Sequence, residues 1–262
     1  MQPLARMPHA ILARLEGVVF DVDDTVTRDG RLERVAFDAM WRLHEAGLRL
    51  GAVTGRPLGW CDVLARMWPV DVAVGENGAG WVWVDADHRL RHGYFADADT
   101  RQEQARCLER VRERVARELP SVAPTADLPA RRCEVAFDVG EAARLDRATV
   151  DRLVACIEAE GARSMVSTVH AHAIPGAWDK AQGVARAARE VLELDLAANR
   201  DRWVFIGDSG NDAAAFAWFE HTVGVANVRG SLDRLSTHPV WVTEADRGGG
   251  FAELADRIVH AR

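Results

Sequence analysis

The chain has 262 residues, of which 48% are hydrophobic, and a formal net charge of −7. This length allows one large or two modest domains around a buried core. The acidic balance argues against a nucleic-acid binder, which needs a basic surface to displace counterions. A phosphorylated substrate is compatible with this charge, because a metal ion and one or two local cations can dominate a pocket.

Cysteine usage and the N-terminal segment bear on the compartment. The four cysteines are far apart in sequence and form no CxxC pair, which indicates reduced thiols rather than a disulfide framework. Residues 1–21 contain no apolar stretch long enough for a signal peptide or a membrane span. We therefore expect a cytoplasmic protein with neither membrane nor nucleic acid as a partner. The oligomeric state is not readable from these features.

Apolar strands alternate with helices in the first part of the chain. The predicted elements are a strand at 17–23, a helix at 31–47, a strand at 48–55, a helix at 58–67 and a strand at 71–75. Strands of this kind, separated by helices, are typical of a parallel sheet that is covered on both faces.

The pattern changes after residue 80. The predicted elements are antiparallel strands at 81–85 and 91–97, a helix at 100–118, a strand at 132–139, a helix at 146–162 and a strand at 164–174. Strands that alternate apolar and polar residues beside amphipathic helices indicate a small α+β domain with one open sheet face.

The first pattern returns at about residue 176. The predicted elements are a helix at 179–194, a strand at 202–208, a helix at 211–219, strands at 221–226 and 239–243, and a final helix. The sequence therefore predicts an α/β fold, a Rossmann-like three-layer core with a parallel sheet, formed by residues 1–84 and 176–262. An inserted α+β cap domain is predicted at 85–175, within the usual size range of domains.

Two acids, Asp21 and Asp23, stand at the carboxyl end of the first predicted strand, in the run DVDDT. Ligands bind at that edge of open α/β sheets. Carboxylates that converge there repel one another unless a cation lies between them, and hard oxygen ligands suit Mg²⁺. The alternative is that these residues simply make a turn or cap the next helix.

Two further polar runs follow predicted strands. In the run TGRP, the hydroxyl of Thr54 and the backbone beside Gly55 suit a phosphate oxygen, although a polar turn before a helix is ordinary. In the run GDSGND, Asp208 and Asp212 bring two more carboxylates to a strand end, or the run is an Asp/Asn turn in which Asn211 caps a helix.

Residue scarcity singles out further positions. Lys180 is the single lysine among 33 Lys and Arg residues, and it stands at the start of a predicted helix. A lone lysine is usually a solvated charge, but a chain that otherwise uses arginine makes this exception worth examining. Asparagine is also scarce, and it occurs at Asn77, Asn199, Asn211 and Asn227.

Taken together and in this order, the four runs resemble the motifs of the haloacid-dehalogenase-like superfamily of phosphohydrolases. DVDDT looks like motif I, VTGR like motif II, the lysine of WDKAQG like motif III and GDSGND like motif IV. The insertion between motifs II and III, preceded by the run ENGA at 76–79, is similar to the type IIB branch. That branch includes Cof-like phosphatases, sucrose- and trehalose-phosphate phosphatases, mannosyl-3-phosphoglycerate phosphatase and phosphomannomutase. Asp24 is a departure, because many members carry glycine there; we expect it to be tolerated, since its side chain need not face the metal.

The resemblance implies a Mg²⁺-dependent phosphatase for a small phosphorylated metabolite, with a sugar phosphate favoured by family analogy alone. Asp21 would be the nucleophile that forms an aspartyl-phosphate, and Asp23 the general acid/base. The metal would be held by Asp21, the backbone carbonyl of Asp23 and Asp208, with Asp212 as a ligand or one contact further out. A phosphomutase, or a catalytically silent phosphate-binding protein on the same fold, remains the alternative. A nucleotide-binding dehydrogenase is disfavoured, because no GxGxxG run follows the first strand.

The resemblance also implies which residues hold the phosphate. Thr54 and Lys180 would contact phosphoryl oxygens as catalytic residues, beside Gly55, and Asn211 would hydrogen-bond near the phosphate or Lys180. Arg56 would either contact the phosphate as well or form a salt bridge that fixes its loop.

The inserted domain would close over the site as a lid. His170 and His172 lie two residues apart on a predicted strand that leads to Lys180, so they share one face. They either contact the substrate or are ordinary packed histidines, and Arg131 and Arg132 are weaker candidates. A zinc site is not expected, because no third ligand is suitably spaced.

Overall fold

A nine-stranded sheet forms the centre of the computed structural model, which describes residues 1–167 and 169–262. Its strand order is β1-β14-β13-β12-β2-β5-β6-β7-β8, parallel from β1 to β6, with β7 and β8 antiparallel. These strands are β1 (Gln2–Pro3), β2 (Gly17–Asp21), β5 (Arg49–Val53), β6 (Val72–Gly75), β7 (Gly80–Val84), β8 (Leu90–Tyr94), β12 (Trp203–Gly207), β13 (His221–Gly224) and β14 (Trp241–Val242).

Helices cover both faces of this sheet. One face carries α1 (His9–Leu12), α2 (Arg34–Glu45), α3 (Leu58–Met67) and α8 (Arg247–His260), and the other carries α6 (Lys180–Val191) and α7 (Ala213–Trp218). Every residue of β2 is buried, and its side chains alternate between the two layers. This arrangement confirms the predicted α/β fold with a covered parallel sheet.

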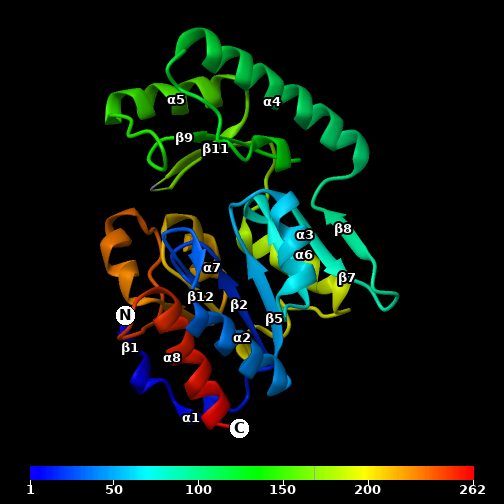
Figure 1. Ribbon diagram of the computed structural model, residues 1–262, viewed down its shortest axis with the longest axis vertical. Helices are drawn as coiled ribbons and strands as arrows, with labels where there is room; N and C mark the ends of the chain where they lie inside the picture. Colours follow the sequence, from blue (N-terminus) through cyan, green and yellow to red (C-terminus); the bar gives the residue numbers. More distant parts are fainter. Residues whose placement is uncertain (168) are drawn as a thin grey trace.

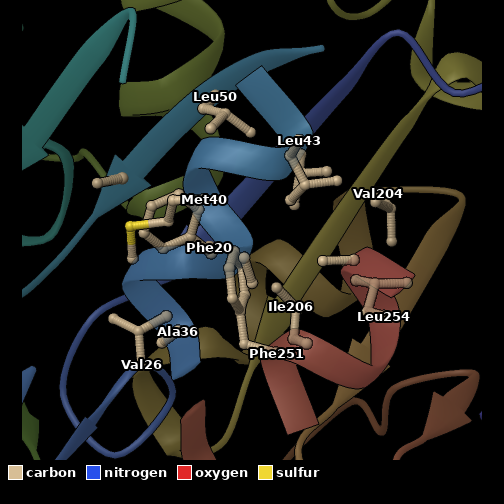
Figure 2. Packing of buried hydrophobic residues seen from close by; sticks show 14 of the residues in the cluster. Phe20, Val26, Ala36, Met40, Leu43, Leu50, Val204, Ile206, Phe251 and Leu254 are labelled. Carbon is tan, nitrogen blue, oxygen red and sulfur yellow. The ribbon is translucent and has the colours of Figure 1, made fainter. Parts of the chain in front are cut away.

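The core beneath α2 and α8 shows why this strand alternation fixes the layers. Phe20 of β2 packs against Phe251 of α8, with ring centroids 5.1 Å apart, and Met40 of α2 lies beside it (Figure 2). The next residue back, Val19, points to the opposite layer and joins the cluster under α6 and α7. A shift of β2 by one residue would therefore move Phe20 and Val19 each into the opposite layer, and it would also misplace Asp21.

A second, smaller unit lies between β8 and α6, and we call it the cap (residues 98–174). Its antiparallel sheet has the order β10-β11-β9, formed by β9 (Val135–Asp138), β10 (Arg163–Val166) and β11 (His170–Ile174). The helices α4 (Ala98–Glu118) and α5 (Arg147–Ala159) pack on one face of it. In Figure 1 the sheet lies between these helices and the core. The open face predicted for this sheet is therefore the face turned toward the core.

Two of the expected elements differ from the structure by more than a shift of a few residues at their ends. The strand expected at 164–174 is an antiparallel hairpin, β10 and β11; Thr168, within that range, lies outside the described residues. The amide of Ser167 donates to the carbonyl of His170 at 2.8 Å, and no Gly, Pro or Asn marked this turn in the sequence. The helix expected at 31–47 starts at Arg34, because a short hairpin of β3 (Thr27–Arg28) and β4 (Arg31–Leu32) precedes it.

The large sheet continues past residue 85, where the sequence placed the domain boundary. Strand β8 pairs with β7 along its whole length, so the boundary at 84/85 would separate two strands of one hairpin. The pairing favours a boundary near residue 97, just before α4 begins. Most residues of β8 are only partly buried, because this strand lies at the edge of the sheet.

The remaining helical turns are short 3₁₀ segments. They are η1 (Leu4–Arg6), η2 (Glu76–Gly78), η3 (Leu128–Ala130), η4 (Arg200–Arg202), η5 (Gly210–Asp212) and η6 (Ala226–Arg234). Among the described residues, no helix combines the length and apolar character that crossing a membrane requires.

Candidate active site

The carboxyl ends of three adjacent parallel strands, β12, β2 and β5, meet at one edge of the sheet beneath the cap. A cleft of about 390 Å³ opens there. Core residues such as Asp21 and Asp208 line one side, and cap residues such as Glu141 and His170 line the other. The runs that the sequence analysis singled out thus converge on one cleft.

Three carboxylates gather at the floor of this cleft. Asp21 ends β2, Asp208 follows β12, and Asp212 ends the 3₁₀ turn η5 that Ser209 caps. All three are buried, and each offers an oxygen within 4.8 Å of the others. An all-oxygen set of this kind suits Mg²⁺ or another hard cation.

The electrostatics of the three acids support this fit. Burial raises the pKa of Asp21 to about 8, against the opposing pull of Lys180, and the charges of Asp212 and Asp23 raise it further. Burial, followed by the charges of Asp21 and Asp212, also raises the pKa of Asp208. One lysine does not balance three buried carboxylates, so a bound divalent cation would relieve their repulsion.

Lys180 begins α6 and points into this acid cluster. Its Nζ donates to Oδ1 of Asp21 at 2.5 Å and to Oδ1 of Asp212 at 2.6 Å, and only 1% of the residue is exposed. Burial lowers the pKa of Lys180, but the two carboxylates more than offset this effect and hold the pKa above its usual value. The alternative of a solvated surface charge is therefore wrong.

Asp212 has no oxygen left over. While Oδ1 accepts from Lys180, Oδ2 accepts from the backbone amides of Asp208 at 2.9 Å and Ser209 at 3.0 Å. Its contacts fix the lysine and the loop that carries Asp208. If a metal binds to Asp21 and Asp208, this geometry favours a role for Asp212 as a residue that holds the neighbouring groups rather than as a direct ligand.

Asp23 lies higher in the cleft, where its side chain is 37% exposed and contacts Arg56. The guanidinium donates to Oδ1 through Nε at 3.0 Å and Nη2 at 2.9 Å, so Arg56 forms the salt bridge that was one of its two predicted roles. The Thr54 hydroxyl accepts from the Arg56 amide at 3.0 Å and lies 3.4 Å from Asp23 Oδ2. The TGRP turn is therefore built around the Asp23 carboxylate.

His170 and His172 are both buried and share the cap face that is turned toward the core. His170 Nε2 lies 2.8 Å from Oε2 of Glu141, and His172 Nδ1 lies 3.1 Å from Oε2 of the buried Glu134. Burial lowers the pKa of His170, although Glu141 opposes this effect. Both histidines line the cleft, where His172 lies close to Gly55.

The two arginines considered as weaker candidates are not among the residues that line the cleft. Arg131 is buried and donates to the carbonyl of Gly55 at 3.0 Å, so it fixes the cap on the TGRP turn. Arg132 contacts the hydroxyl of Tyr94 at 3.2 Å and does not line the cleft.

The asparagines carry a signal that sequence reasoning only partly used. Asn211 donates to Asn77 at 3.5 Å, and Asn227 donates to Asp208 at 3.2 Å. Three of the four asparagines thus belong to the site. The scarcity of asparagine in the sequence could therefore have indicated Asn77 and Asn227, as well as Asn211, as site residues.

Asp24, which replaces the glycine common at this position, has a positive φ of 56°. Aspartate tolerates this left-handed conformation better than most residues. Its Oδ1 accepts from Nε of Arg247 at 2.8 Å, and its carbonyl accepts from Asn227 at 2.9 Å. The side chain faces Arg247 rather than the acid cluster. Arg247 and Glu141 are cleft residues that no motif in the sequence indicated.

Solved structures with the same architecture cover nearly the whole chain. A Thermoplasma acidophilum protein aligns with a TM-score of 0.71 at 20% identity over 93% of this chain and 98% of its own. A sucrose-phosphatase from Synechocystis, solved with sucrose and phosphate, aligns with a TM-score of 0.65 at 14% identity over 93% and 98%.

A haloacid dehalogenase-like hydrolase from Bacteroides thetaiotaomicron aligns with a TM-score of 0.63 at 17% identity, over 93% of this chain and 99% of its own. No protein-family model and no curated protein sequence matches the chain. The resemblance therefore rests on three-dimensional structure together with the four motifs. The chain has the fold of the haloacid dehalogenase-like hydrolases.

Proposed function

We propose that this protein is a Mg²⁺-dependent phosphatase that hydrolyses a small phosphorylated metabolite through an aspartyl-phosphate on Asp21. One observation carries the proposal. The buried carboxylate of Asp21 lies against Lys180, 2.5 Å away, in the same cleft as the half-exposed carboxylate of Asp23. A buried nucleophile and a more exposed proton carrier in one cleft are what a two-step phosphoryl transfer requires.

In the first step, an oxygen of Asp21 attacks the phosphorus in line with the leaving oxygen. The P–O bond to the leaving group breaks, its electron pair stays on the leaving oxygen, and Asp23 donates a proton to that oxygen. Lys180 and Thr54 stabilise the charge on the phosphoryl oxygens, and Asn211 orients one of them. Because the reaction depends mainly on positioning, the tight contacts of Lys180 support this assignment.

In the second step, water attacks the phosphorus of the aspartyl-phosphate. Asp23 takes the proton of that water, the acyl phosphate bond breaks, and inorganic phosphate leaves with Asp21 restored as a carboxylate. The same carboxyl group is thus acid first and base second. Its partial exposure to the cleft supports contact with both the leaving group and the incoming water.

Asp21, Asp208 and the backbone carbonyl of Asp23 would hold the metal. When bound, Mg²⁺ offsets the charge of the carboxylates and of one phosphoryl oxygen, so that an anionic nucleophile can approach an anionic ester. Asp212 would hold Lys180 and the loop of Asp208, because its oxygens already accept three hydrogen bonds. The Asp208 carboxylate is itself held by Thr25 and Asn227, each at 3.2 Å.

The cap limits the substrate to a small ester. The cleft of about 390 Å³ lies between the core and the cap sheet, so a phosphoprotein would not enter it. A sugar phosphate is our proposed substrate class, with the likeness to a sucrose-phosphatase as its support. We also propose a cytoplasmic location, in keeping with the free thiols of all four cysteines.

A screen of phosphorylated metabolites tests this function. We expect phosphate release from at least one small ester with Mg²⁺ present, none with excess EDTA, and none from Asp21→Asn. Measuring free phosphate against transfer to an added sugar separates hydrolysis from a mutase reaction. Phosphate release by Asp21→Asn at the wild-type rate would overturn the assignment of the nucleophile.

A further inference from the structure

Arg56 lies between one carboxylate from the core and one from the cap. On the core side, its Nε and Nη2 hold Asp23 at 2.9–3.1 Å. On the cap side, Nη1 and Nη2 both lie 3.3 Å from Oε1 of Glu141. The planar fork of a guanidinium presents its N–H donors in fixed directions, so it can bind two carboxylates at once and fix their orientation.

Glu141 is itself held in place on the cap. The backbone amides from Gly140 to Ala143 all donate to the carboxylate of Asp138, at 2.8–3.2 Å, so the turn that carries Glu141 is fixed. The second carboxylate oxygen of Glu141, Oε2, lies 2.8 Å from Nε2 of the buried His170. A side chain that is 47% exposed thus meets Arg56 in one defined orientation.

Two further groups, Trp60 and Asp127, lie near the guanidinium of Arg56 without forming a hydrogen bond to it. Its guanidinium carbon lies 5.0 Å from the ring centre of Trp60, and Asp127 approaches to 3.9 Å. Asp127 also belongs to the cap, but at this distance it forms an ion pair without a hydrogen bond. Among the described residues, Glu141 is therefore the cap group that forms hydrogen bonds to the guanidinium that holds Asp23.

We propose that Glu141 is a positioning residue, which acts through Arg56 to hold Asp23 in its proton-transferring position only while the cap is docked. The inference rests on the proposed function, in which Asp23 moves both protons. Cap closure and correct placement of the acid/base then become one event. An open enzyme would keep its nucleophile, Asp21, but would transfer protons poorly.

Leaving-group chemistry separates this role from a structural one. p-Nitrophenolate leaves without a proton, so with p-nitrophenyl phosphate Asp23 is needed only in the second step. Glu141→Gln should keep the rate of the initial nitrophenolate burst within about twofold and slow the steady state by at least about tenfold. With an alkyl phosphate, which needs the proton in the first step, turnover should fall by at least about tenfold without a burst.

Two controls make the outcome decisive. Glu160→Gln removes another paired cap carboxylate, 3.0 Å from Arg114 and away from the cleft, and should keep both phases and the Tm of the wild type. In an Asp23→Asn background, Glu141→Gln should change the rates of the burst and of the slow phase by less than about twofold. The reason is that the Asp23 carboxylate, which Glu141 is proposed to position, is already absent.

Three results would overturn the proposal. Equal slowing of the burst and the steady state by Glu141→Gln, or multiplicative losses in the Asp23→Asn background, would mean that Glu141 only supports the fold. A Glu141→Gln enzyme with wild-type kinetics would also remove the positioning role while leaving the phosphatase assignment intact. If the wild-type protein released no phosphate from any ester, the proposed function itself would fail.

Discussion

The acid cluster on the floor of the cleft and the contact between Glu141 and Arg56 on its cap side are built in opposite ways. On the floor, Lys180, Asp208 and Asp212 are each at most 6% exposed, and each makes at least two hydrogen bonds. On the cap side, Glu141 is half-exposed and its contacts to Arg56 are long. In the proposed function, the parallel sheet would hold the groups that act on the phosphoryl group, while the contact between Glu141 and Arg56 would form only when the cap docks.

Breaking the floor should have the largest effect. Lys180→Arg keeps the charge but replaces a compact ammonium by a broad fork, in a space bounded by Asp21 and Asp212. We expect kcat/KM to fall at least about 100-fold, or about 2.7 kcal/mol of transition-state stabilisation. A substrate-saturation series on the purified variant measures this loss.

The matched control for that variant exchanges the same two residue types at an arginine of the cap. Arg132→Lys changes the same pair of residue types outside the cleft and should retain activity within about twofold, because Arg132 makes only half-exposed contacts. Lys180→Arg with near-wild-type activity would show that any cation suffices at the floor.

The next effect concerns the charge balance of the floor. Without metal, the pKa of Asp21 is raised from 3.8 to about 8 in the folded state. Between these two pH values, the folded state keeps a proton on Asp21 that the unfolded state has lost. Stability should therefore fall as the pH rises from about 4 to 8, because the unfolded state binds fewer protons than the folded state. Mg²⁺ should reduce this loss by stabilising the ionised carboxylates.

Thermal unfolding at pH 5.5 and pH 8, with EDTA and with Mg²⁺, measures this balance. Each kcal/mol of stability lost should lower the Tm by about 2–4 °C in a protein of this size. Asp21→Asn should flatten the dependence in EDTA, since the titrating group is gone. A Tm that rises between these pH values in EDTA, or is indifferent to Mg²⁺, would contradict the account of the acid cluster.

The smallest effect is expected from His172, the cap histidine that does not contact Glu141. His172 is bound to Glu134, which Asn77 and Trp178 also contact, so its loss leaves that carboxylate with partners. His172→Ala should raise KM for the physiological ester severalfold and leave hydrolysis of a small aryl phosphate nearly unchanged. Equal losses on both esters would assign His172 to the fold or to the core site.

The sequence indicated the floor because strand ends meet at one edge of a parallel sheet. Asp21, Thr54 and Asp208 each follow an apolar run, and Lys180 stood out by composition alone. These signals are local, and the sheet brings them together without help from the cap. The α/β fold followed from the same strand and helix periodicities.

The remaining features depend on contacts between distant segments. Glu141 lies in an ordinary turn, and only the docking of cap on core brings it to Arg56. Arg247 reaches Asp24 from the start of the last helix, with a positive φ of 49° that no local pattern signalled. The pairing of β8 with β7 also extends the large sheet past residue 84, where no local pattern showed that the sheet continues.

Trapping the intermediate tests the central claim most directly. Asp23→Asn keeps the nucleophile and loses the base that activates water in the second step. With an aryl phosphate, the aspartyl-phosphate should therefore form faster than it is hydrolysed, and it should accumulate. After rapid acid quench, mass spectrometry of proteolytic fragments should find one phosphoryl group on Asp21, and none in the variant that also carries Asp21→Asn. Phosphate on any other residue, or catalysis by Asp21→Asn at the wild-type rate, would contradict the account.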